Sequence, residues 1–169
     1  MDFNYFDKQT ISEVLIPEEL IGYWYIRSRR YEFRADGRYY VHELNTPYQL
    51  IESGMTLVYN GIRFKRLYGD PSGLPGVWLL ESDTTEEWNI RSDGTYTWHW
   101  PGYEYFGEYL NNETVMSTCE MRAVLSESTG ILTFDPPYAP SVSGVWNIDE
   151  PKLTIAFPSG DVIYTRDPK

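Results

Sequence analysis

The chain has 169 residues, with 25 acidic and 14 basic side chains, a formal charge of −11 at pH 7, and a single cysteine, Cys119. Aromatic residues make up 17% of the chain, which excludes a disordered polypeptide, while one cysteine excludes an intramolecular disulfide and a cysteine-rich zinc site. The acidity argues against nucleic acid or an anionic membrane surface as a partner, because phosphate groups are bound by clustered lysines and arginines.

A short amphipathic helix is expected near the N-terminus. Thr10 and Glu13 have the spacing of a capping box, and apolar side chains follow at helical spacing until Pro17 ends the helix. The first residues show neither the basic region nor the apolar run of a signal peptide, and no apolar run reaches the roughly 18 residues of a membrane-spanning helix. We therefore expect a cytoplasmic protein.

The rest of the chain is predicted to form antiparallel strands arranged as an internal duplication. A Gly-x-Trp pattern occurs at 22–24 and at 76–78, and each copy precedes alternating aromatic and apolar residues around an Asp-Gly pair, which is a hairpin signal. The segment ends also match, since each copy closes on an aromatic-x-Arg triplet that ends at Arg66 or Arg166. We infer repeat units at about 20–68 and 75–167.

One domain is expected over 1–169, because a first unit of about 50 residues rarely sustains a free-standing β core. Two half-sheets that close into a single barrel share a core and leave no sheet edge exposed. The segment 113–126 is predicted as a strand, because its apolar side chains recur at every second residue. The region 110–143 has no assigned role.

This pattern resembles the calycin superfamily, and within it the small bacterial lipocalin-like domains. The resemblance is carried by the two Gly-x-Trp motifs, the two Asp-Gly hairpins and the late arginines. It implies an antiparallel barrel that holds a small apolar ligand, with Trp24 and Trp78 as plugs and Arg66 and Arg166 stacked on them. A guanidinium over an indole ring is a favourable cation–π pair in a partly dry site.

A dense set of aromatic residues follows the two predicted hairpins. Aromatic walls with a few polar tips are typical of ligand pockets, and plain core packing is the alternative explanation. The side chains expected to line a ligand-binding cavity are Tyr39, Tyr96, Trp98, Trp100 and Tyr105.

Two carboxylates are candidates for general acid or base catalysis. Glu43 falls on the side of its strand that is expected to face inward, and Glu104 stands between two tyrosines. Burial at either position would raise the pKa of the carboxyl group. The alternative is that each carboxylate lies at an open rim beside water. Glu86 is expected in solvent near a strand end. The alternation of residues places His42 and His99 on the solvent side. Cys119 is expected to be a buried, inert thiol.

The leading hypothesis is a binding protein for a small hydrophobic or aromatic molecule. The first alternative is a cofactor-independent cyclase or isomerase that uses the same cavity, with Glu43 or Glu104 as the acid or base. The second is an acidic immunity or inhibitor protein that binds a basic partner. The sequence shows no phosphate-binding, dinucleotide-binding or metal-binding motif, so we expect no cofactor and no metal. Neither the ligand nor the oligomeric state follows from the sequence.

Overall fold

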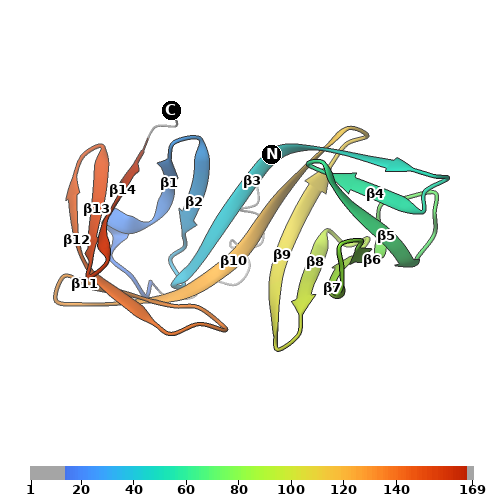
Figure 1. The fold of residues 1–169 in the computed structure, drawn as a ribbon. Coiled ribbons are helices and arrows are strands. Elements are labelled where there is room, and N and C mark those ends of the chain that lie inside the picture. Colours follow the sequence, from blue (N-terminus) through green and yellow to red (C-terminus); the bar gives the residue numbers. More distant parts are fainter. Residues whose placement is uncertain (1–13, 167–169) are drawn as a thin grey trace. The chain divides into compact units, whose positions relative to one another are not determined.

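The computed structural model describes residues 14–166, and nearly all of their regular structure is antiparallel β-sheet (Figure 1). The strands pair in chain order into a closed ring of fourteen, in which β1 (Gly22–Ile26) pairs with β14 (Gly160–Thr165). The all-β antiparallel architecture predicted from the sequence is confirmed. Within the described residues, no helix has the length and apolar character needed to cross a membrane.

The predicted N-terminal helix is not supported. Its first residues, from Thr10 to Glu13, lie outside the described part of the chain, and residues 14–17 are not helical. The one helical turn among the described residues is the 3-10 helix η2 (Glu18–Leu20), which follows Pro17. Proline is tolerated at the start of a helix but not within it, so the turn begins after Pro17 instead of ending there.

The chain divides into two compact units, which do not coincide with the two sequence repeats. Unit 1 comprises Glu43–Glu120, and the described part of unit 2 comprises residues 14–42 and 121–166. The chain passes from one unit to the other within β3 (Arg38–Ile51) and again within β10 (Val115–Ser128). β3 and β10 each contribute residues to both units, so the division into units does not by itself separate two domains. The expected single domain over 1–169 stays a prediction.

Unit 1 contains eight strand segments, namely the later part of β3, the first part of β10 and six strands between them. The six strands are β4 (Thr56–Tyr59), β5 (Ile62–Tyr68), β6 (Gly76–Leu80), β7 (Asp83–Ile90), β8 (Thr95–Trp100) and β9 (Tyr103–Asn111). The Tyr48 amide donates to the Thr114 carbonyl (3.0 Å) and the Asn45 amide to the Ser117 hydroxyl (2.8 Å). These bonds join the first segment to the last, so the unit closes on itself.

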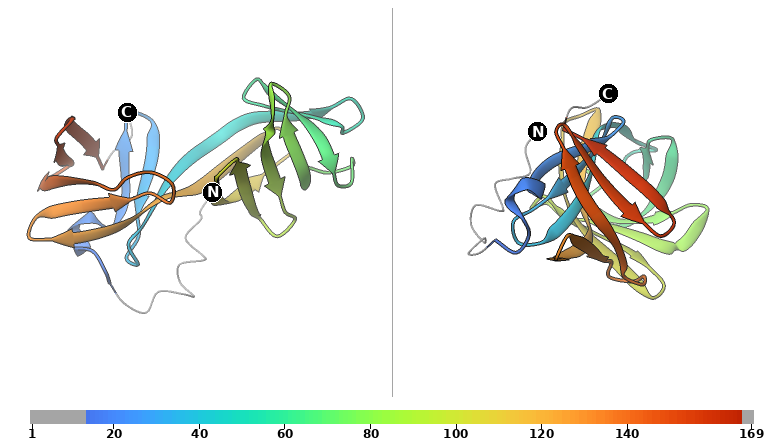
Figure 2. Two further views of the ribbon diagram at one scale, coloured as in Figure 1. Left: turned by 60° about the horizontal axis from the view of Figure 1, so that its bottom comes forward. Right: turned by 90° about the vertical axis from the view of Figure 1, so that its left-hand side faces the viewer.

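Unit 2 has the same number of strand segments in its described part. They are β1, β2 (Arg29–Phe33), the first part of β3, the later part of β10, β11 (Ile131–Asp135), β12 (Val142–Asp149), β13 (Lys152–Phe157) and β14. The last three form a meander, coloured orange to red in Figure 2. Closure comes from the pairing of β1 with β14 and from a 2.6 Å bond between the Leu125 amide and the Gly37 carbonyl.

Both predicted Asp-Gly hairpins are confirmed. They connect β2 to β3 and β7 to β8, with Gly37 and Gly94 at positive φ angles of 85° and 89°. Such angles are accessible to glycine because it has no Cβ. In each turn the preceding aspartate side chain accepts a bond from the backbone amide two residues later, at 3.0 Å for Asp36 and 2.9 Å for Asp93. This Asx-type bond supplies the turn with an acceptor that the sheet does not provide.

Each unit is stabilised by a stacked arginine and tryptophan. The Arg166 guanidinium lies 3.6 Å from the Trp24 ring centroid in unit 2, and that of Arg66 lies 4.2 Å from the Trp78 ring in unit 1. Both indoles are fully buried, and each indole N–H donates to the carbonyl four residues earlier, in Leu20 or Leu74. The predicted stacking is confirmed, and the arginine that ends one repeat covers the tryptophan that begins the other.

Gly76, the glycine of the second Gly-x-Trp motif, makes room for the Arg66 guanidinium. That guanidinium donates to the carbonyl oxygens of Gly54, Gly73 and Pro75 at 2.8, 2.5 and 3.0 Å. A Cβ on Gly76 would lie 2.5 Å from the Arg66 Nη1 atom and 2.5 Å from the Tyr68 carbonyl oxygen, which is closer than real Cβ atoms approach their neighbours. The motif therefore needs glycine because the arginine side chain crosses this backbone.

We predict that Gly76→Ala lowers the free energy of unfolding by about 2 kcal/mol, since overpacking a tight site costs roughly that much. Urea unfolding followed by tryptophan fluorescence measures the loss. Gly73→Ala is the matched control, because its Cβ would meet only the Pro75 ring at an ordinary 3.6 Å. Equal stability of the two variants would show that Arg66 does not depend on this close approach.

Candidate functional site

The candidate site lies on one face of strands β7, β8 and β9 in unit 1. In the strand register, Trp88 pairs with Trp98 and Trp98 pairs with Tyr105, while Trp100 pairs with Tyr103. Residues that are directly opposite across a pair, or two apart along a strand, share a face. These five rings therefore form one continuous aromatic surface, and tryptophan and tyrosine favour such pleated positions.

The aromatic surface runs from the core of unit 1 towards solvent. Trp88 is fully buried and packs against Phe64, Tyr59 and Tyr96, with ring centroids 5.0 to 5.8 Å away. Trp98 lies 4.7 Å from Trp88 and is half-buried. The inner rings are thus part of the core, and the outer rings are half-buried.

Three half-buried rings stand at the outer end of this surface. The ring centroid of Trp100 is 5.0 Å from Tyr103 and 6.3 Å from Tyr105, and the two tyrosine rings are 5.9 Å apart. The angles between the ring planes are 66°, 90° and 75°, so the three rings form a corner. The Trp100 indole N–H is buried and has no acceptor among the described residues.

Glu86 brings a carboxylate to the same surface. One of its oxygens accepts a 2.5 Å bond from the indole N–H of Trp98, and the side chain is half-buried in β7. Burial raises the pKa of Tyr103, and the charges of Tyr105 and Glu86 raise it further. The expectation of a solvated Glu86 was wrong. Its position two residues before Trp88 in the same strand was the signal, because alternation places both side chains on one face.

The predicted cavity residues fall into two groups. Trp98, Trp100 and Tyr105 lie together on the surface just described. Tyr96 is 3% exposed, and its hydroxyl donates to Glu120 in the core of unit 1. Tyr39 belongs to the core of unit 2, where it packs on aromatic rings and its hydroxyl bonds to that of Tyr164 at 3.0 Å.

The two predicted catalytic carboxylates both lie beside solvent. Glu104 alternates with Tyr103 and Tyr105, so it points to the opposite face of β9, where it bonds to His99 at 3.2 Å. Both of those side chains are more than two-fifths exposed. Glu43 is exposed, and its charge contributes to the raised pKa of Tyr59, which burial raises most. Glu104 thus occupies a position beside water, as the alternative explanation anticipated.

The expectation that both histidines face solvent was wrong for His42, which is 1% exposed. Its neighbours on β3, Tyr40 and Val41, are both buried, so this strand lacks the solvent face that the alternation argument assumes. Instead, charged side chains from β2 surround the ring in unit 2. Cys119 is buried and forms no disulfide, as predicted.

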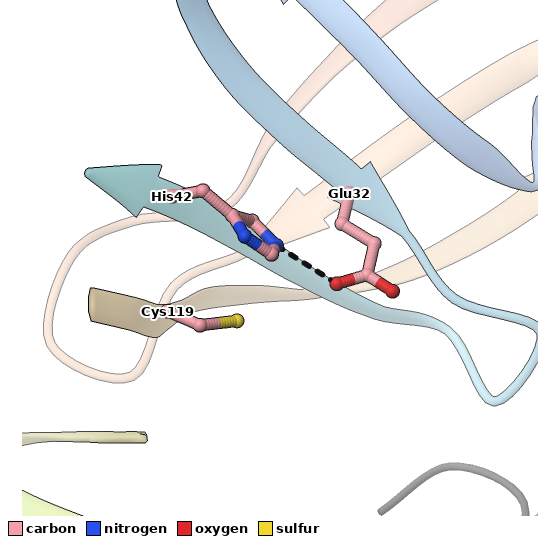
Figure 3. Close-up of side chains that lie close together, drawn as sticks. All are labelled: Glu32, His42 and Cys119. Atoms are coloured by element: carbon pink, nitrogen blue, oxygen red, sulfur yellow. Dashed lines mark hydrogen bonds and ion pairs between the residues drawn. The ribbon is translucent and has the colours of Figure 1, made fainter. Parts of the chain in front are cut away.

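The His42 ring bonds to the Glu32 carboxylate, as Figure 3 shows, and also lies against the Arg30 guanidinium. Its Nε2 atom lies 2.9 Å from a Glu32 carboxylate oxygen, and its Nδ1 atom lies 3.0 Å from Nη2 of Arg30. A guanidinium only donates, so Nδ1 must accept and the proton sits on Nε2, which donates to Glu32. Arg34 also donates to Glu32, at 3.2 Å. The ring is therefore neutral in this network, and its two nitrogens are both engaged.

Burial lowers the pKa of His42, and the charges of Arg30 and Arg34 lower it further, against the opposing effect of Glu32. Burial alone would raise the pKa of Glu32, but His42 and Arg34 together lower it below its ordinary value. Two guanidinium groups beside this pair oppose the binding of a metal cation. The network is a structural feature of unit 2 with a depressed histidine pKa.

Comparison of the chain with models of protein families, with curated proteins and with solved structures finds no match.

We predict that the free energy of unfolding falls as the pH drops below about 6.5, the ordinary pKa of histidine. Because the native pKa of His42 is lowered, the unfolded chain binds the proton more readily and acid favours unfolding. Protonation of Glu32 adds a further loss below pH 4.5. Denaturant unfolding of wild type and His42→Gln between pH 5 and pH 7.5 measures the effect.

The histidine variant is expected to be less stable than wild type at pH 7.5 and to show a flatter dependence between pH 7 and pH 5. His99→Gln, at a largely exposed position, is the control and should keep the slope of the wild type. An unchanged slope in His42→Gln would mean that another group carries the acid sensitivity.

Proposed function

We propose that the protein binds a small, partly aromatic or apolar molecule on the surface formed by Trp98, Trp100, Tyr103 and Tyr105 in unit 1. The supporting observation is the half-buried state of all four rings on an aromatic surface whose inner end is core. A small-molecule site combines apolar walls with a few polar groups that orient the ligand. Glu86 is such a group.

Tyr39 and Tyr96 are left out of the proposed site, although the sequence suggested both. Their rings are 8% and 3% exposed, and their hydroxyl groups are bonded within the protein, so they offer a ligand little surface. Their role in this proposal is to support the core on which the outer rings stand.

We also propose that the chain is related in architecture to the calycins, as the sequence motifs suggested. The support is the arginine stacked on the buried tryptophan of a Gly-x-Trp motif, which occurs once in each unit. A fold relationship of this kind would agree with ligand binding but would not establish it, since one fold hosts many functions.

The cyclase or isomerase alternative receives less support than binding. It relied on Glu43 and Glu104, and Glu104 points to the other face of β9 from the tyrosines beside it. The carboxylate nearest the aromatic rings is Glu86, whose bonded oxygen is already engaged by Trp98. The net charge of −11 favours the immunity-protein alternative only in general terms, because no described contact marks a partner surface.

We predict that protein purified gently from its host carries a small molecule in native mass spectrometry that is lost on denaturation. Trp100→Ala should weaken binding of the recovered molecule by about tenfold or more, because tryptophan side chains in half-buried sites carry much of the binding energy. Isothermal titration calorimetry with the recovered molecule measures the change.

Phe106→Ala is the matched control, because this ring lies on the opposite face of β9 and is 52% exposed. It should bind like wild type, and both variants should unfold at similar denaturant concentrations. A host-purified protein with no bound molecule, or equal affinities in the two variants, would count against this site.

A further inference from the structure

We propose that the ligand of this aromatic surface is an organic cation, namely a protonated amine or a quaternary ammonium compound with an apolar or aromatic portion. This inference rests on the proposed binding function and names the chemical class of the ligand. It follows from the charge of the strands that build the site, from an unpaired carboxylate among the rings and from the orientation of the rings.

The strands around the site are strongly acidic. Between residues 81 and 112 the sequence contains seven carboxylate side chains and a single arginine, Arg91, with no lysine. The Arg91 guanidinium donates to the hydroxyl groups of Thr95 and Thr97 at 3.4 and 3.0 Å. Thr97 alternates with Trp98 along β8, so this cation lies on the other face of the strand. This segment therefore brings one carboxylate, Glu86, and no lysine or arginine to the face of the rings, which favours cations over anions there.

Glu86 has no positively charged partner in the described part of the chain. Its one bond there is the neutral indole N–H of Trp98. A carboxylate has lone pairs for about four hydrogen bonds, so one donor leaves most of its acceptor capacity unused. A half-buried anion without a counter-charge is unfavourable, and the charges of buried groups are ordinarily paired. An ammonium group of a ligand would supply the missing charge.

The rings next to Glu86 suit the same ligand. Trp100, Tyr103 and Tyr105 meet at steep angles, so that their faces and edges form a corner. The face of an aromatic ring is electronegative and attracts ammonium groups, most strongly for tryptophan. Glu86 bonds to Trp98, which stands directly opposite Tyr105 and two residues from Trp100 along β8, so the carboxylate belongs to the same aromatic surface.

Three probes of the same size test the inference: phenethylammonium, 2-phenylethanol and phenylacetate. Chemical shifts of the indole N–H signals report binding, with Trp98 and Trp100 at the site and the fully buried Trp24 and Trp78 as internal references. We expect phenethylammonium to bind about tenfold more tightly than 2-phenylethanol, from a cation–π and ion-pair contribution, and phenylacetate to bind most weakly.

Glu86→Gln removes the charge and keeps an oxygen that can accept the Trp98 bond. This variant should lose most of the preference for phenethylammonium, measured as the ratio of its affinity to that of 2-phenylethanol. Glu104→Gln is the matched control, because it removes an equal charge from the opposite face of β9. It should keep the preference for the cation.

The outcomes separate this inference from the proposed function. If 2-phenylethanol binds as tightly as the amine, or if Glu86→Gln keeps the preference, then the site binds small molecules but is not selective for cations. If none of the probes shifts the Trp98 or Trp100 signals at millimolar concentration, the binding site itself is wrong. Protein unfolding measured on each variant confirms that the comparison is between folded proteins.

Discussion

The arginine that lies on a buried tryptophan is the interaction on which each unit depends. In unit 1, Arg66 stacks on Trp78. Its guanidinium also donates hydrogen bonds to three backbone carbonyls in two separate loops, so one side chain connects the end of β5 to the start of β6. Buried carbonyls without donors are costly, and a guanidinium supplies several donors in one plane. The glycine of the Gly-x-Trp motif has no Cβ, which allows the arginine to cross the backbone there.

The same interaction explains how two units arise from two repeats. The arginine of the first repeat covers the tryptophan of the second, and the arginine of the second covers the tryptophan of the first. Unit 1 therefore combines the end of the first repeat with the beginning of the second, and unit 2 combines the beginning of the first repeat with the end of the second. The long strands β3 and β10 carry the chain across, and this arrangement accounts for their length of 14 residues each.

Within unit 1, one aromatic surface serves both stability and the proposed function. The inner rings around Trp88 are packed in the core, which holds β7, β8 and β9 in register. The pairing of β8 with β9 extends beyond these core rings to Trp100 and Tyr103. Strand pairing therefore holds these two rings on the same surface, although they are not part of the core. A rigid sheet thus presents half-buried rings and Glu86 in a defined geometry, which favours binding because little has to be ordered when a ligand arrives.

The sequence by itself determined the all-β architecture and the two Asp-Gly hairpins, because these depend on local alternation and on short motifs, while the stacking of arginine on tryptophan was implied by the resemblance to the calycins. It also placed Tyr96, Trp98 and Trp100 on one face of their strand. Only the tertiary structure decided which arginine meets which tryptophan, that His42 is buried and that Glu86 belongs with the rings. The physical reason is that pairing between distant strands sets which faces are covered, and alternation along one strand cannot show what lies on either side.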